Sequence, residues 1–171
     1  MSIHRIGNVF IADTARVLGE VTLGDDVNIW YGVSIRGDVA PIILGSATNV
    51  QDNAVIHCDK GYPNVIGANV TIGHGAIVHG ESVGDGTLIG MGATVLGHTK
   101  IGKGCIIAAG AVVTPGMVVP DGMVVLGVPG KIVRPTNDTE KQYLADIPPR
   151  YVENARRHAE QRDDPRVRPY R

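Results

Sequence analysis

Aliphatic residues recur at every sixth position along most of the chain, with glycine, small and polar residues between them. The period runs from Ile11 to Ile35 and is longest from Val83 to Val125. No pattern at helical spacing competes with it over this stretch. A fixed short period is typical of repeat architectures, in which each unit buries its apolar face only against its neighbours. The pattern therefore predicts a solenoid of short strands joined by tight turns.

Three irregularities interrupt the period. Residues 37–43 and 58–65 are insertions between repeats, and the repeat that begins at Val78 is one residue short. Insertions in repeat proteins map to loops and often gather on the functional face. We therefore expect loops at 37–43 and 58–65 beside the functional residues.

Composition narrows the picture. The 171 residues suit one domain, and with 23 glycines and only 4% aromatic residues we expect a thin, regular core of Val and Ile. The net charge of −1 indicates neither nucleic acid nor an anionic membrane as partner. No signal peptide and no long apolar run stands in the sequence, which favours a cytoplasmic protein. Two cysteines make no disulfide framework.

The chemistry-bearing residues concentrate between residues 57 and 79, where His57, His74 and His79 stand in an otherwise aliphatic background. Three imidazoles are a ligand set suited to a catalytic zinc, which keeps a fourth position for water. Zn²⁺ is therefore the expected metal. Because imidazoles also bind iron and cobalt, Fe²⁺ and Co²⁺ are alternatives.

The period resembles the hexapeptide repeat of left-handed parallel β-helices, in which three hexapeptides form one triangular coil with faces A, B and C. The resemblance implies an all-β solenoid, a left-handed parallel β-helix of hexapeptide repeats with a C-terminal α-helix. Successive coils then lie about 4.8 Å apart, the spacing of neighbouring strands. The left hand comes from the resemblance, because ordinary crossover rules predict the opposite one.

The register places the histidines on two different sides of the triangle. With Ile11 on face A, Arg36, His57 and His79 each directly follow a face-B residue and form a column. His74 follows a face-A residue by two positions, in the same column as Asp52. One chain can scarcely bring all three histidines to one ion. We therefore expect a cyclic homotrimer with a metal at each interface, His57 and His79 from one subunit and His74 from its neighbour.

This arrangement resembles that of γ-class carbonic anhydrases, and three segments carry the resemblance: IRGD at 35–38, TNVQDNAVIH at 48–57 and IGHGAIVHG at 72–80. It implies reversible hydration of CO2 to bicarbonate by a metal-activated water. The implied roles are metal ligands (His57, His74 and His79), an inter-subunit ion pair (Arg36 and Asp38), and residues that line or support the pocket (Asn49, Gln51 and Asp52). In the family the glutamine contacts the metal-bound water or bicarbonate. Two plainer interpretations remain: Arg36 and Asp38 form an ordinary surface pair, and Asn49 and Gln51 satisfy local backbone.

One position departs from the family pattern. The family's prototype carries a proton-transferring glutamate directly after the aspartate of RGD, and here that residue is Val39. The segment 58–65 also lacks the prototype's acidic loop, which leaves Asp59 and Tyr62 as the candidates for this role. Metal binding is therefore a safer expectation than fast turnover.

The end of the chain differs in character. We expect the β-helix at 1–135, a helical segment at 136–162 and a disordered tail at 163–171. Within the helical segment, a capping box at Asn137 and Glu140 begins one short helix, and Pro148-Pro149 ends it and starts a second. In the family this region reaches the active site, which makes Tyr151 and Asn154 pocket candidates.

Two other functions stay open. The segment GVPGKIVRP at 127–135 resembles the terminating segment of hexapeptide acyltransferases, so an enzyme acting on coenzyme A thioesters is one alternative. A non-catalytic trimeric metal-binding scaffold is the other. The remaining histidines, His4, His98 and His158, are expected on the surface. Cys58 is expected outside the set of metal ligands, and Cys105 in the core.

Overall fold

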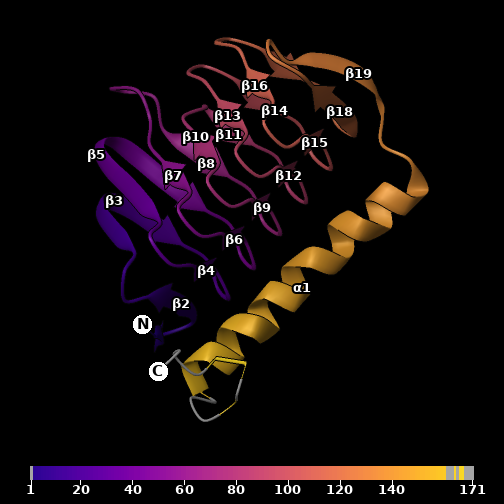
Figure 1. Ribbon diagram of the computed structural model, residues 1–171. Helices are drawn as coiled ribbons and strands as arrows, with labels where there is room; N and C mark the ends of the chain where they lie inside the picture. Colours follow the sequence, from indigo (N-terminus) through magenta and orange to yellow (C-terminus); the bar gives the residue numbers. More distant parts are fainter. Residues whose placement is uncertain (1, 161–163, 165, 168–171) are drawn as a thin grey trace.

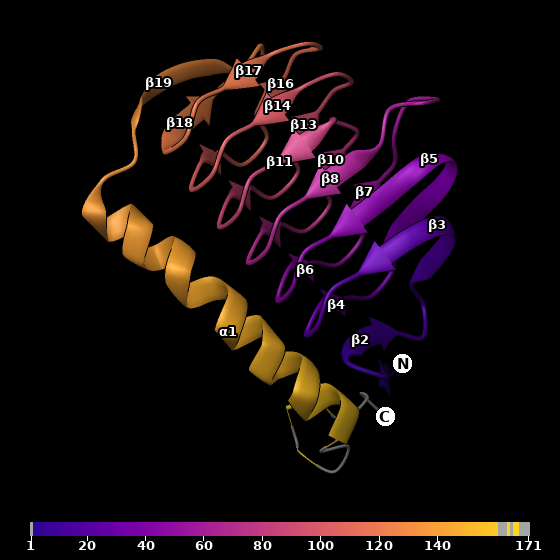
Figure 2. The same ribbon diagram turned by 180° about the vertical axis from the view of Figure 1, so that it is seen from behind.

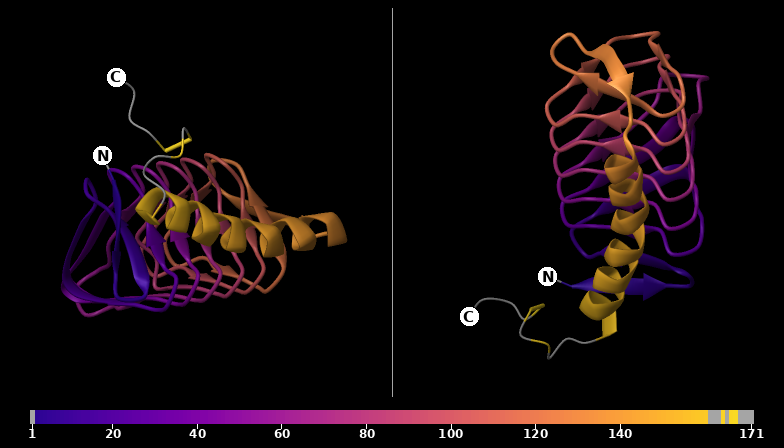
Figure 3. Two further views of the ribbon diagram at one scale, coloured as in Figure 1. Left: turned by 90° about the horizontal axis from the view of Figure 1, so that it is seen from below. Right: turned by 90° about the vertical axis from the view of Figure 1, so that its right-hand side faces the viewer.

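The computed structural model describes residues 2–160, 164, 166 and 167. Short strands wind into a three-sided prism, and a single long helix runs along one side (Figures 1 and 2). Seen along the stack, the coils form a triangle with the helix packed against one of its sides (Figure 3).

Face A is a nine-stranded sheet, parallel from β2 to β18 and with an antiparallel pair at each end. Its strands, in order, are β1 (Ile3–Ile6), β2 (Val9–Ala12), β4 (Asn28–Ile29), β6 (Asn49–Val50), β9 (Thr71–Ile72), β12 (Leu88–Ile89), β15 (Ile106–Ile107), β18 (Met123–Leu126) and β19 (Lys131–Pro135).

Faces B and C belong to one ten-stranded sheet that bends around a corner of the prism. The long strands β3 (Arg16–Leu23) and β5 (Ser34–Leu44) span both faces. Face B continues with β7 (Val55–Ile56), β10 (Ile77–Val78), β13 (Thr94–Val95) and β16 (Val112–Val113), and face C with β8 (Asn64–Ile66), β11 (Ser82–Val83), β14 (Lys100–Ile101) and β17 (Val118–Val119).

Strand pairing confirms the six-residue register. On face B, Ile35 pairs with Ile56, Ile56 with Val78 and Val78 with Val95. These side chains are fully buried, since each has 0% exposure. Because β-branched side chains fit a pleated, buried surface, a column of Val and Ile fills the narrow core without aromatic bulk.

The expectation of a loop at 37–43 was wrong. These residues lie inside β5, which pairs with β3 around the corner with an irregularity opposite Gly19 and Val21. The pattern had indicated a loop between two strands, but the extra residues instead lengthen the pair of strands β3 and β5. The loop expected at 58–65 is confirmed for residues 58–63, which lie outside the strands, whereas residues 64 and 65 already belong to β8.

The expectation of two helices was also wrong, because one helix, α1 (Asp138–Glu160), contains both Pro148 and Pro149. Proline in a helix interior removes a backbone hydrogen bond and usually kinks or breaks the helix. Here buried side chains on both sides of the pair hold the helix against the prism: Leu144, Ile147, Val152 and Ala155.

The start of α1 matches the prediction. The Glu140 amide donates to Asn137 Oδ1 at 2.8 Å, and the Asn137 amide donates to Glu140 Oε2 at 2.9 Å. This reciprocal pair is a capping box. No helix in the described part of the chain has the length and apolarity needed to cross a membrane. The tail predicted to be disordered falls almost wholly outside the described residues.

Candidate metal centre

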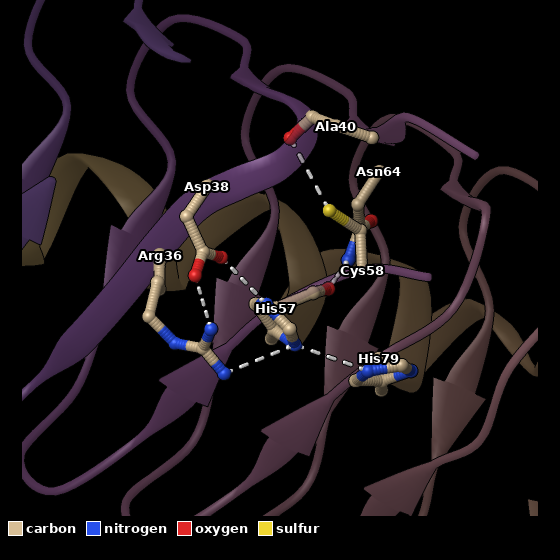
Figure 4. A network of polar contacts seen from close by, with 7 residues as sticks. All are labelled: Arg36, Asp38, Ala40, His57, Cys58, Asn64 and His79. Atoms are coloured by element: carbon tan, nitrogen blue, oxygen red, sulfur yellow. Dashed lines mark hydrogen bonds and ion pairs between the residues drawn. The ribbon is translucent and has the colours of Figure 1, made fainter. Parts of the chain in front are cut away.

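His57 and His79 lie side by side on neighbouring coils, each directly after a face-B strand. Parallel pairing of Ile56 with Val78 sets this position. His57 Nδ1 and His79 Nε2 are 3.2 Å apart, and the dashed line between the two tilted rings in Figure 4 marks this contact. Two nitrogens bound to one tetrahedral zinc at roughly 2.0–2.1 Å lie about 3.3 Å apart. The pair therefore fits two ligand positions of a single ion.

A carboxylate fixes the orientation of His57. Asp38 Oδ1 lies 2.9 Å from His57 Nε2, and Arg36 pairs with the other oxygen of the same carboxylate (Figure 4). The hydrogen bond from His57, followed by that from Arg36, holds the pKa of Asp38 below its usual range. An ionised Asp38 accepts a hydrogen bond from the Nε2–H of His57, so that Nδ1 carries no proton, the state that a metal ligand requires. The ion pair of Arg36 and Asp38 lies within one chain here.

Asn64, which the sequence had not singled out, anchors the backbone at this point. Its side-chain amide donates to the carbonyls of His57, at 2.9 Å, and Val78, at 3.2 Å. Its only sequence signal is a polar residue at the start of a repeat just after an insertion. The neighbouring Cys58 thiol donates to the Ala40 carbonyl, and burial raises the pKa of this thiol. A neutral, buried thiol agrees with its expected place outside the metal set.

His74 lies on the turn between faces A and B, where its partner is Asp52. His74 Nδ1 is 2.9 Å from Asp52 Oδ2, which leaves Nε2 for another ligand. Two glycines allow the tight turn. A Cβ on Gly73 would lie 2.7 Å from the Met91 amide nitrogen, and Gly75 has a φ of +67°, which side chains disfavour.

These residues form two separate groups. We call His57, His79 and Asp38 the two-histidine half-site, and His74 with Asp52 the one-histidine half-site. Over residues 2–160, 164, 166 and 167, no three His, Cys, Asp or Glu side chains of one chain are grouped so that they could hold a metal ion. The donor chemistry fits zinc, but a single chain brings together only part of the ligand set.

A third carboxylate, Asp59, stands near His79. Its Oδ2 lies 3.7 Å from His79 Nδ1 and 3.8 Å from His98 Nε2. The ring of Tyr62 meets His98 edge-on, with 4.4 Å between the ring centroids. His98 is about half exposed, as expected, and Val39 is 40% exposed.

Gln51 and Asn49 are buried and form a directed network. Asn49 Nδ2 donates to Thr71 Oγ1 at 2.9 Å, so its Oδ1 is free to accept from Gln51 Nε2 at 3.0 Å. Gln51 is only 4% exposed, and among the described residues its Oε1 has no hydrogen-bond partner. In the described part of the chain the buried side-chain atom without a partner is Asn64 Oδ1, so Gln51 Oε1 is an accessible acceptor. Such an acceptor suits a ligand with an O–H or N–H group.

Tyr151 belongs to an aromatic cluster between α1 and face A. Its ring meets Trp30 edge-on, with 5.5 Å between centroids, and burial raises the pKa of its hydroxyl. His158, expected on the surface, is instead half-buried against Trp30, and its Nδ1 lies 3.1 Å from the Tyr31 hydroxyl. The packing of α1 accounts for this difference. Asn154 accepts a hydrogen bond from Arg157 and is not among the residues of this cluster.

Comparisons with known proteins agree with this fold. The family profile described as bacterial transferase hexapeptide (six repeats) matches residues 82–115, and that described as hexapeptide repeat of succinyl-transferase matches residues 63–97. A solved hexapeptide transferase family protein from Anaplasma phagocytophilum has a TM-score of 0.84 and 38% identity, covering 88% of this chain and 89% of that one.

Two curated relatives narrow the family. A Methanocaldococcus jannaschii protein named "Probable carbonic anhydrase" is 48% identical over 145 residues, which cover 85% of this chain and 91% of that protein. The mitochondrial γ carbonic anhydrase 2 of Arabidopsis thaliana is 40% identical over 158 residues, which cover 89% of this chain but only 57% of the plant protein. Because the Methanocaldococcus jannaschii protein is 48% identical over 85% of this chain and 91% of its own length, family membership is shown. The chain belongs to the γ-class carbonic anhydrase-like family of hexapeptide-repeat, left-handed β-helix proteins.

Proposed function

We propose that the chain forms a cyclic homotrimer that hydrates CO2 reversibly to bicarbonate at metal sites between its subunits. The observation that carries this proposal is the division of the histidines into two half-sites, each oriented by its own carboxylate. In a heterologous interface the two-histidine half-site of one subunit meets the one-histidine half-site of the next. Three such contacts close a trimer.

Each histidine offers one nitrogen to the ion. The carboxylates occupy His57 Nε2 and His74 Nδ1, so His57 Nδ1 and His74 Nε2 are the ligand atoms. His79 contributes Nε2, which faces His57. Zn²⁺ is the expected metal, with Fe²⁺ or Co²⁺ as alternatives, and it would supply a water whose pKa is lowered to about 7.

The chain's other polar groups orient the reactants. Gln51 Oε1 is held away from Asn49 and is free to accept from the hydroxyl of bicarbonate or from a reacting water. Its Nε2 is committed to Asn49, so the carboxamide cannot turn over without losing that bond. Tyr151 offers a hydroxyl from α1, and the Arg36–Asp38 pair, which we also assign to the subunit contact, keeps His57 in its ligand tautomer.

The proposal is tested by three measurements on the purified protein: molecular mass in solution, bound metal per chain, and CO2 hydration. We expect a trimer with one ion per chain and measurable hydration that is lost on metal removal and restored by zinc. A fully metal-loaded trimer that hydrates no CO2 in any buffer would refute the activity. The remaining interpretation would then be a non-catalytic, metal-binding scaffold.

An acyl- or thioester-handling enzyme is the second candidate, and one observation favours it. A cavity of about 360 Å³ lies between α1 and face A, with Gln51 and Tyr151 in its wall. That volume is larger than CO2 requires. Coenzyme A binding and thioester hydrolysis, measured on the same preparation, separate this candidate from the first.

A further inference from the structure

The groove between α1 and face A has one polar end and a long apolar body. Its floor is made by residues of β9, β12 and β15 and by the turns that follow them, including Leu88, Met91 and Ala108. The helix supplies the opposite wall, with side chains spaced so that they share one helical face: Tyr143, Ile147, Arg150 and Tyr151. Gln51, directly after β6, lies at the polar end.

The size of the groove is far beyond a three-atom substrate. Its volume of about 360 Å³ falls in the range typical of pockets for larger organic ligands, 300 to 1,000 Å³. From β6 to β15 it crosses three strand spacings, roughly 14 Å. The nine residues from Tyr143 to Tyr151 are separated by eight steps and span about 12 Å of helix. An extended chain advances roughly 1.2 Å per bond, so about ten bonds fill this length.

The polar groups favour a head group that accepts hydrogen bonds and carries negative charge. Arg150 lies in the groove wall next to Tyr151, and among the described residues its one acidic contact is Asp146, at 3.4 Å. The Arg150 side chain is 68% exposed and therefore free to turn toward a bound anion. The Tyr151 hydroxyl also lines the groove and adds a neutral donor, since burial, followed by the charge of Asp52, raises its pKa.

We propose that this groove binds a medium-chain aliphatic monocarboxylate of about eight to ten carbons. The carboxylate lies between the Tyr151 hydroxyl and Arg150, turned away from Gln51 Oε1, because that oxygen is itself an acceptor. The alkyl chain runs along β9 and β12 toward Ala108. This binding depends on neither the metal nor CO2 hydration.

The first test is the affinity of the full-length protein for a series from butanoate to dodecanoate, measured by calorimetry below the micelle concentrations. Each added methylene should tighten binding about fourfold, the value expected for burying one CH2 group. The gain should stop near ten carbons, where the groove ends. A flat series overturns the proposal, as does a gain that continues unchanged to dodecanoate, which would indicate non-specific adsorption.

Two variants separate the tail from the head. Ala108→Leu adds volume inside the groove and should weaken octanoate at least as much as octanol, whereas Val118→Leu, on face C, should change neither. Arg150→Gln should weaken octanoate by about fivefold to tenfold but leave octanol unchanged. Arg156→Gln is its matched control, because Arg156 has an equally long ion pair, 3.4 Å to Asp26, outside the groove.

The outcomes are decisive in both directions. Saturable binding with a plateau in chain length, lost in Ala108→Leu, supports the groove as a carboxylate site even if CO2 hydration is absent. The absence of saturable octanoate binding in the intact oligomer overturns it, and is the result expected if a neighbouring subunit fills the groove. Equal effects of Arg150→Gln and Arg156→Gln would contradict the assigned head group.

Discussion

The first coils and the later coils of the prism share one backbone frame but carry different chemistry. The position directly after the face-B strand and the position two after the face-A strand recur down the whole stack. In the first four coils these two positions hold charged residues, histidines or a tyrosine, with Leu18 as the exception, and in the later coils they hold none of these. The first position is occupied in turn by Leu18, Arg36, His57, His79, Leu96 and Thr114, and the second by Asp13, Tyr31, Asp52, His74, Met91 and Ala109.

The core beneath both regions is the same. Ile56 and Val78, under the histidines, are as fully buried as Val95 and Val113, which lie under Leu96 and Thr114. The outward side chains can therefore change without altering the packing that sets their spacing. This comparison teaches that the repeat supplies the geometry and that a few outward substitutions supply the function.

The largest effect is expected from the ligands themselves. His57→Ala, His74→Ala or His79→Ala should each weaken metal binding by more than about a hundredfold, because the loss of a ligand exceeds that of an outer partner. Bound metal per chain and affinity in competition with a chelator measure this effect.

The matched controls come from the same columns. Leu96→Ala stands one coil below His79, and Met91→Ala one coil below His74, so both test the frame without the chemistry. His98→Ala removes a histidine that lies outside both columns. If any of these three empties the site as thoroughly as the ligand variants, the register of the half-sites is wrong.

The carboxylates should produce the next largest effect. Asp38→Asn and Asp52→Asn each remove a partner 2.9 Å from a ligand histidine and should lower metal affinity about 10- to 100-fold. Asp59→Asn should do less, because Asp59 is 3.7 Å from His79. Asp85→Asn, whose partner is Lys103, is the control and should leave metal affinity unchanged. An equal loss in all four variants would point to net charge and away from histidine orientation.

Proton transfer offers a smaller effect. With Val39 at the family's glutamate position, CO2 hydration should rise with buffer concentration, and Val39→Glu should raise turnover several-fold in weak buffer. Val39 and Ile43 lie on the same strand and are 40% and 39% exposed, so Ile43→Glu is a matched control that should change nothing. A fast wild type that ignores buffer would show another route, with Asp59 and Tyr62 the first residues to test.

The smallest effect concerns the packing of α1. Burial, followed by the charge of Arg157, lowers the pKa of His158 from its usual 6.5, while Asp52 partly opposes this shift. The unfolded chain therefore binds the proton more readily, and the contribution of His158 to stability is complete above pH 6.5 and lost as pH falls through the lowered pKa. Thermal unfolding and Trp30 fluorescence should show this loss, and His158→Phe should remove it. A pH response that is unchanged in the variant would assign it to other groups.

The sequence predicted the prism well because its core obeys one rule repeated at a fixed period. Ile35, Ile56 and Val78 lie in one buried column as their spacing required. Loop and helix details were harder to predict. The extra residues at 37–43 extend a strand pair, and the Pro148-Pro149 pair sits inside a helix, since in both places tertiary packing overrides local signals.

The candidate site divides in the same way. The columns of Arg36, His57 and His79 and of Asp52 and His74 followed from the period alone. The roles of Asn64 and His158 did not, because each depends on a contact between segments that the period does not relate. Asn64 reaches back to His57, and His158 meets Tyr31 across 127 residues of chain.

The claim that one metal site combines two subunits is tested most directly by mixing two variants that each lack a different half-site. His74→Ala and His79→Ala chains, tagged differently, are unfolded, mixed and reassembled, and the trimers that contain both chains are isolated. Neither variant alone should bind metal. Each mixed trimer has one interface where an intact two-histidine half-site meets an intact one-histidine half-site, so it should bind about one ion, against about three in the wild type. Mixed trimers that bind none, or a metal-loaded monomer with all three histidines as ligands, would contradict the account.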